Sequence, residues 1–141
     1  MAPMTQSPAS QSPASQKPVI YVCITCRRQG KQDTEAESEP HFGALLAAAT
    51  ECAANGSEVT VRRLRCLANC SRGPSAAVCA DGSWTYLFGG LDTTNAGALV
   101  EGAKLLAAAA DGILPWRGRP DILKRNLIAR VPPLDFEEAD L

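Results

Sequence analysis

The sequence lacks a charge imbalance, a long apolar run and a second histidine. Fourteen Lys and Arg residues stand against fifteen Asp and Glu residues, which gives a formal net charge of −1. This balance gives no argument for a nucleic-acid or membrane partner. The Ala-rich stretch at 103–110 contains Lys104 and is too short to span a bilayer. The one histidine, His41, follows Pro40 at a predicted helix start, where we expect it to face solvent.

The residue sets of common enzyme sites are also missing. The sequence contains no phosphate-binding loop, no Ser–His–Asp set and no paired catalytic carboxylates. We therefore do not expect an enzyme with its own substrate pocket. Residues 1–18 lack the apolar core of a signal peptide and the arginines of a transit peptide. We expect a cytoplasmic protein, in which structural disulfides are rare.

Three regions follow from composition and periodicity. Residues 1–18 contain the repeat Gln-Ser-Pro-Ala-Ser, bury almost nothing and are predicted to be a disordered tail. Residues 19–112 carry strand patterns at 19–22, 58–64, 75–80 and 84–88 and helix patterns at 41–54 and 95–110. The order β-α-β-β-β-α, with a hairpin at Asp81-Gly82, predicts an α/β fold with a thioredoxin-like mixed sheet and helices packed against it. Residues 113–141 form a C-terminal extension, with a short amphipathic helix predicted at 120–131.

Six cysteines are the main chemical signal. Cys23 and Cys26 follow the first predicted strand, and Cys66 and Cys70 follow the second. Because the strands of a βαβ unit run parallel, both cysteine pairs are expected at the same edge of the sheet. Four thiolates at one point favour a soft metal, and the spacing is compatible with zinc or an iron–sulfur cluster.

The charges around these cysteines are positive. No acidic residue lies within 22–28 or 62–72. Nearby cations favour thiolates over thiols, and they suit an oxidised 2Fe–2S centre that carries a net charge of about −2 with its four thiolates. The basic residues in these two segments are Arg27, Arg28, Arg62, Arg63, Arg65 and Arg72.

The other two cysteines fit core packing better. Cys52 lies among alanines in the first predicted helix, and Cys79 lies inside the third predicted strand. Cys79 is the better candidate for a spare metal ligand, because it is close in sequence to Cys66 and Cys70.

The segment Cys-Leu-Ala-Asn-Cys-Ser-Arg-Gly-Pro at 66–74, followed by Asp81-Gly82, Trp84 and Tyr86, resembles the second half of thioredoxin-like 2Fe–2S ferredoxins. These include the Shethna-type ferredoxins and the small iron–sulfur subunit of respiratory complex I. The whole chain after the tail is similar to a bacterial group of predicted metal-binding proteins described as thioredoxin-like ferredoxins. Its matching pieces are 22–27, 66–74, 84–89, 111–112, 115–117, 119–120 and 129–133.

This resemblance implies a single-electron carrier and a 2Fe–2S cluster bound by Cys23, Cys26, Cys66 and Cys70. It also implies a redox partner protein and a link to cobalamin biosynthesis. Two residues separate Cys23 and Cys26, whereas the better-studied relatives have four or more between their first two ligands.

Two other functions remain open at this point. One is a zinc-binding structural or metal-handling protein that uses the same four cysteines. The other is a thiol oxidoreductase that uses Cys23 and Cys26, with Pro74 in the place of the usual cis-proline. A polar segment at 27–40 separates Cys26 from the next helix, which argues against a thiol activated by a helix N-terminus. The oligomeric state is also open, a homodimer included.

A second region of interest lies in the C-terminal extension. Trp116 stands beside Arg117 and Arg119. These residues either dock a partner or belong to a segment that covers the core.

Overall fold

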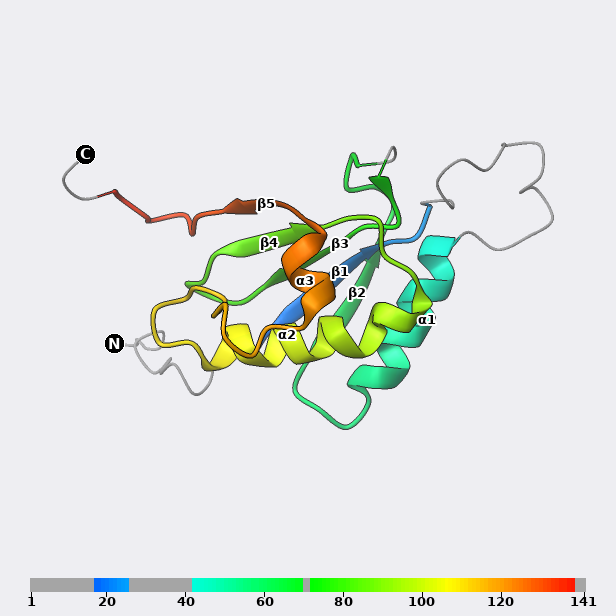
Figure 1. Cartoon of the computed structure of the whole chain (residues 1–141), viewed down its shortest axis with the longest axis horizontal. Helices are drawn as coiled ribbons and strands as arrows, with labels where there is room; N and C mark the ends of the chain where they lie inside the picture. Colours follow the sequence, from blue (N-terminus) through cyan, green and yellow to red (C-terminus); the bar gives the residue numbers. More distant parts are fainter. Residues whose placement is uncertain (1–16, 26–41, 70–71, 139–141) are drawn as a thin grey trace, which may run out of the picture.

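The computed structural model describes residues 17–25, 42–69 and 72–138 (Figure 1). The predicted order β-α-β-β-β-α is confirmed, and a further helix and strand follow it. The predicted tail falls mainly on residues 1–16, outside the described ranges, whereas Pro18 is buried beside the first strand. The elements are β1 (Val19–Cys23), α1 (Phe42–Ala54), β2 (Thr60–Leu64), β3 (Ala76–Cys79), β4 (Thr85–Phe88), η5 (Thr93–Asn95), α2 (Ala96–Ala108), α3 (Asp121–Arg125) and β5 (Leu127–Val131).

The five strands form one mixed sheet in the order β2-β1-β3-β4-β5. β1 and β2 run parallel, with Cys23 opposite Leu64. β3 runs antiparallel to β1 and returns through the predicted hairpin to β4. Because β1 and β2 are parallel, their C-terminal ends lie at the same edge of the sheet, as the sequence predicted.

The hydrophobic core lies between one face of the sheet and the helices. Ile20 and Val22 of β1 are fully buried, as is Val78 of β3. Helices α1 and α2 pack against each other and against this face (Figure 1). Leu123 of α3 is also fully buried and lies so close to Gly102 that a Cβ at that glycine would collide with it. The alternate strand residues, such as Tyr21 in β1, lie on the opposite face.

The predicted helix over 120–131 is wrong beyond Arg125. The chain leaves the helical conformation at Asn126, and 127–131 form strand β5 instead. β5 pairs antiparallel with β4, with an irregularity between Leu87 and Phe88. This pairing satisfies backbone groups of β4 that an unpaired edge strand would leave to solvent. The spacing Leu123, Leu127, Val131 fitted a helix, but sheet pairing outweighs a weak local pattern.

The helices in the described ranges are all too short or too polar to cross a membrane.

Candidate metal centre

Cys23 and Cys66 lie at the edge where β1 and β2 end. Cys23 is the last residue of β1 and is fully buried. The ladder continues one step further, because the Ile24 N–H donates to the Leu64 carbonyl at 2.9 Å. Cys66 follows two residues after Leu64 and is exposed. One buried and one exposed sulfur therefore lie on two adjacent strand ends.

The carbonyl of Arg65 joins these two strand ends. The Cys23 thiol donates to it across 3.3 Å, and the Thr25 hydroxyl donates to the same oxygen. The Thr25 Oγ1 also lies 3.8 Å from the Cys23 sulfur. Since Arg65 directly precedes Cys66, these bonds bring the Cys23 sulfur to the start of the second cysteine loop.

Cys66 receives a hydrogen bond from its own loop. The backbone N–H of Ala68 donates to the Cys66 sulfur at 3.1 Å. Ala68 has a φ of 60°, the left-handed conformation that costs a residue with a Cβ about 1 kcal/mol. Strain of this kind is found at functional sites, and here it accompanies an N–H aimed at sulfur.

The other two predicted ligands, Cys26 and Cys70, lie outside the described residues, as does His41. Within the described ranges, no group of three or more His, Cys, Asp or Glu side chains is placed to hold a metal. The structure therefore brings together one cysteine from each predicted pair.

The segment after the second pair enters β3 through a buried turn. The Gly73–Pro74 peptide bond is cis, and Pro74 is buried. The carbonyl of Pro74 accepts a hydrogen bond from the Leu91 N–H at 3.1 Å. The cysteine loop is thus tied at its far end to the residues that follow β4.

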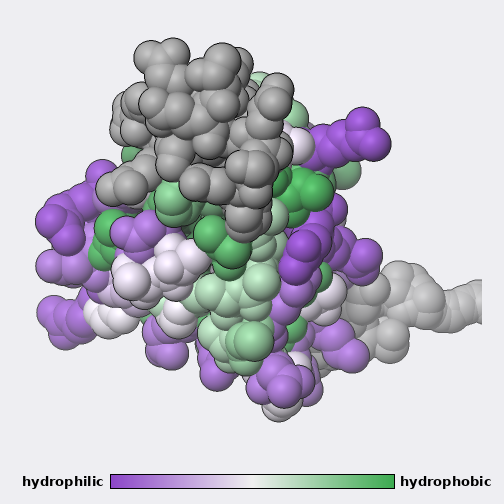
Figure 2. Space-filling model, turned by 90° about the vertical axis from the view of Figure 1, so that its right-hand side faces the viewer, coloured by the Kyte–Doolittle hydropathy of each residue, from purple (hydrophilic) through white to green (hydrophobic). Residues whose placement is uncertain are grey.

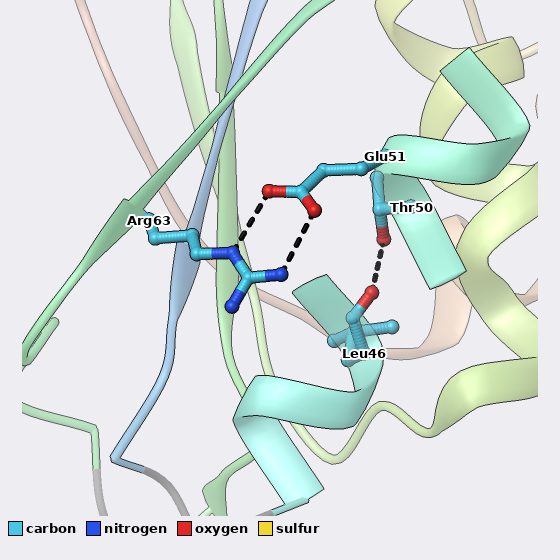
Figure 3. Close-up of polar contacts among 4 residues, drawn as sticks. All are labelled: Leu46, Thr50, Glu51 and Arg63. Atoms are coloured by element: carbon cyan, nitrogen blue, oxygen red, sulfur yellow. Dashed lines mark hydrogen bonds and ion pairs between the residues drawn. The ribbon is translucent and has the colours of Figure 1, made fainter. Parts of the chain in front are cut away.

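The arginines at this edge are exposed, and one of them is paired. Arg63 of β2 donates from Nε and Nη2 to the two carboxylate oxygens of Glu51 in α1, each at 2.8 Å (Figure 3). Hydrogen bonding from Arg63 is the main reason that the pKa of Glu51 is lowered. In the same helix, the Thr50 hydroxyl donates to the Leu46 carbonyl at 2.7 Å (Figure 3). Arg62, Arg65 and Arg72 are exposed and have no carboxylate partner among the described residues.

Figure 2 shows the molecule from the side on which β1 ends and α1 lies. Hydrophilic residues flank a weakly hydrophobic central surface there, as expected for the Ala-rich α1. Leu45 of this helix is 39% exposed, and Cys52 is exposed as well. The prediction that Cys52 packs in the core is therefore wrong. An alanine-rich helix has little amphipathic contrast, so the sequence did not indicate which side faces solvent.

A family model described as "Protein of unknown function (DUF1636)" matches residues 20–133. The chain belongs to this family. Comparison with curated protein sequences finds no match.

Two solved structures of the thioredoxin-like [2Fe–2S] ferredoxin from Aquifex aeolicus are similar to the DUF1636 chain. The first has a TM-score of 0.52 at 16% identity and covers 85% of this chain and 98% of the ferredoxin. The second, a crystal structure of the wild-type ferredoxin, has a TM-score of 0.51 at 16% identity, with 80% and 97% covered. The predicted thioredoxin-like fold is confirmed.

Cys79 of the DUF1636 chain is far from this edge, so its role as a spare ligand is wrong. It pairs with Val19, four residues before Cys23 on the antiparallel neighbour. Four residues of strand span about 13 Å. Burial, and to a smaller extent Asp81, raises the pKa of the Cys79 thiol, which also opposes the thiolate form. It is half-buried and close to the core position expected for it.

The sequence did not identify the backbone groups of the site. The Arg65 carbonyl and the Ala68 N–H both contact cysteine sulfur, and neither uses a side chain. Alanine gives no signal for a left-handed conformation, which glycine or asparagine would have given.

Proposed function

We propose that this protein is a cytoplasmic single-electron carrier, and that Cys23, Cys26, Cys66 and Cys70 hold a 2Fe–2S cluster. The observation that carries the proposal is the hydrogen bond from the Cys23 thiol to the carbonyl of Arg65, the residue that directly precedes Cys66. Each predicted pair thus contributes a sulfur at the same sheet edge. The fold that the chain shares with a thioredoxin-like [2Fe–2S] ferredoxin supports it.

The donor chemistry fits such a cluster. When bound, the cluster supplies one-electron redox chemistry, and its irons require cysteine thiolates. Cys23 must therefore lose the proton that it shares with the Arg65 carbonyl. Thr25 can turn its hydroxyl from that carbonyl to the Cys23 sulfur, which already lies 3.8 Å away. The Ala68 N–H already donates to Cys66 and needs no rearrangement.

The exposed arginines act on the same equilibrium. Positive charge near the cysteines favours thiolates and an anionic cluster, and salt weakens this effect at an exposed edge. A redox partner protein would dock here. The proposed link to cobalamin biosynthesis rests on the resemblance of the sequence motifs.

Anaerobic purification with a visible spectrum and with iron, sulfide and zinc analysis tests the proposal. We expect a coloured protein with about two irons and two sulfides per chain. Cys66→Ser and Cys70→Ser should each bleach or destabilise the centre. Cys52→Ser is the matched control, because Cys52 is an exposed cysteine on α1, and its spectrum should be unchanged.

Two results would overturn this assignment. Unchanged spectra for both Cys66→Ser and Cys70→Ser would remove the second pair from the centre. A colourless protein with one zinc per chain would replace the electron carrier by the zinc-binding alternative, since four thiolates also suit zinc.

A further inference from the structure

The second cysteine loop is residues 66–74, and its described parts, 66–69 and 72–74, contact the chain that follows β4. The Gly90 N–H donates to the Arg72 carbonyl, and the Leu91 N–H donates to the Pro74 carbonyl at 3.1 Å. Within the loop, the Arg72 N–H donates to the Asn69 carbonyl at 3.0 Å. These bonds fix the described residues on both sides of Cys70.

Gly89 lets the loop approach this closely. A Cβ at Gly89 would lie 2.6 Å from both the Arg72 carbonyl oxygen and the Asn69 Nδ2. Neither separation is tolerated between real atoms, so any side chain at Gly89 displaces the loop. The Asn69 amide in turn donates to the hydroxyl of Ser75, which is fully buried, at 3.0 Å. Gly89 thus lies in close contact with the described part of the cysteine loop, at Asn69 and Arg72.

Asn126 contacts Gly89 and Gly90 on the side away from the cysteine loop. Its Nδ2 donates to the Gly89 carbonyl at 2.8 Å and to the Gly90 carbonyl at 3.1 Å. Its own carbonyl accepts the Gly89 N–H at 3.0 Å. Asn126 lies between α3 and β5. Through its bonds to Gly89 and Gly90, it connects the C-terminal extension to the cysteine loop. The consecutive glycines directly after a strand are the sequence signal that would have indicated a close backbone approach.

We propose that Asn126 is a positioning residue for the second cysteine loop, acting through Gly89 and Gly90. Without its amide, two carbonyls lose their donor and Gly89-Gly90 is held by fewer bonds. The loop then samples conformations in which the Ala68 N–H no longer points at Cys66. The consequence for a bound cluster rests on the proposed function, whereas the consequence for the Cys66 thiol does not.

Site-resolved alkylation of the metal-free full chain tests this inference. Iodoacetamide reaction is followed by mass spectrometry for Cys66, with exposed Cys52 as the reference in the same molecule. Asn126→Ala should raise amide exchange in the described residues 66–69 and 72–74 at least about fivefold, the change in population that the net loss of one of its two hydrogen bonds gives. The Cys66/Cys52 rate ratio should change with it, because the loop no longer holds the Ala68 N–H on the exposed Cys66 sulfur.

Tyr86→Phe is the matched control. It removes a different anchor of the C-terminal extension, because the Tyr86 hydroxyl accepts the Leu114 N–H at 2.9 Å in the buried core. It should lower stability without changing the Cys66/Cys52 ratio. An equal change of the ratio in both variants would show a general loss of stability and overturn the positioning role, as would an unchanged ratio in Asn126→Ala.

A milder variant and a second readout complete the test. Asn126→Ser keeps a short hydroxyl donor and should give an intermediate ratio; if Asn126→Ala fails to fold, a wild-type ratio in Asn126→Ser overturns the role. In protein that carries a cluster, Asn126→Ser should shift the visible circular dichroism signature, and Tyr86→Phe should not. If no cluster is found, the alkylation result stands by itself, so the two proposals fail independently.

Discussion

Positive charge is used differently in two regions of this molecule. In the C-terminal segment 113–131, three of the five cations, Arg119, Lys124 and Arg130, lie over aromatic rings. The Arg119 guanidinium lies 5.1 Å from the Trp116 ring centre and 5.8 Å from that of Tyr86. Lys124 lies 4.8 Å from Trp116, and Arg130 lies 4.3 Å from Trp84.

At the cysteine edge, the arginines have no such partners within the described ranges. Arg62, Arg65 and Arg72 are exposed and contact neither a ring nor a carboxylate there. Arg63, with its Glu51 pair, is the exception. Arg119, Lys124 and Arg130 therefore contribute to packing of the C-terminal segment, whereas Arg62, Arg65 and Arg72 remain available to anionic groups. The formal net charge of −1 is a sum over the chain and does not show this difference between the two regions.

Arg119→Ala gives the largest expected effect on stability. Its Nη2 donates to the Leu114 carbonyl at 2.7 Å, and its Nε donates to the Pro115 carbonyl at 3.1 Å. Loss of these charged hydrogen bonds and of the ring contacts should cost about 2 kcal/mol. Urea unfolding measures the change. Arg117→Ala, at an exposed neighbour, should stay within about 0.5 kcal/mol, and equal losses in the two variants would erase the distinction.

The Glu51–Arg63 pair should have a smaller effect. Both side chains are about two-fifths exposed (42% for Arg63 and 41% for Glu51), so solvent screens the pair and Glu51→Gln should cost roughly 0.5 kcal/mol. The folded pKa of Glu51 is lowered, so this contribution is present above the unfolded pKa and is lost as pH falls through the folded pKa.

Unfolding at neutral pH and in acid, with and without salt, measures this dependence. Glu58→Gln is the control, because Glu58 is exposed and makes no ion pair among the described residues. A cost that is the same at both pH values would contradict the pairing as the source of stability.

Arg65→Gln and Arg72→Gln should change stability least, by less than about 0.5 kcal/mol. Their effect should lie in chemistry at Cys66. Reaction with dianionic dithionitrobenzoate should slow relative to neutral dithiodipyridine, about twofold for each arginine removed. The difference should vanish at high salt, and Arg117→Gln should show none.

The reagent experiment also tests whether the arginines at the cysteine edge differ from the ring-bound cations of the C-terminal segment. Residues 26–41 contain Arg27, Arg28 and Lys31 and four acids: Asp33, Glu35, Glu37 and Glu39. A reagent preference that does not change in Arg65→Gln and Arg72→Gln would show that the positive charge at the cysteine edge is neutralised in solution.

The sequence predicted the fold well where local pattern and chain direction agree. The β-branched and aromatic run before Cys23, together with the parallel βαβ rule, placed Cys23 and Cys66 at one edge. The hairpin at Asp81-Gly82 also reverses the chain, and following it correctly would have moved Cys79 away from that edge. The identity of β5 could not be read from 120–131, because its pairing depends on β4 rather than on local periodicity.

The support of the candidate site was harder to predict. Arg65 and Ala68 act through the backbone, and Asn126 acts through residues 36 and 37 positions away in sequence. Contacts of this kind depend on which loops the sheet order brings together. A list of metal-ligating residue types does not contain that information.

The place of Asn126 in the chain sets an order of assembly. Synthesis runs from the N-terminus, so Cys66 leaves the ribosome 60 residues ahead of Asn126 (126 − 66). Until then Gly89 lacks its Asn126 contacts and β4 lacks β5. The nascent chain thus exposes the Cys66 thiol before the contacts of Asn126 with Gly89 and Gly90 can form.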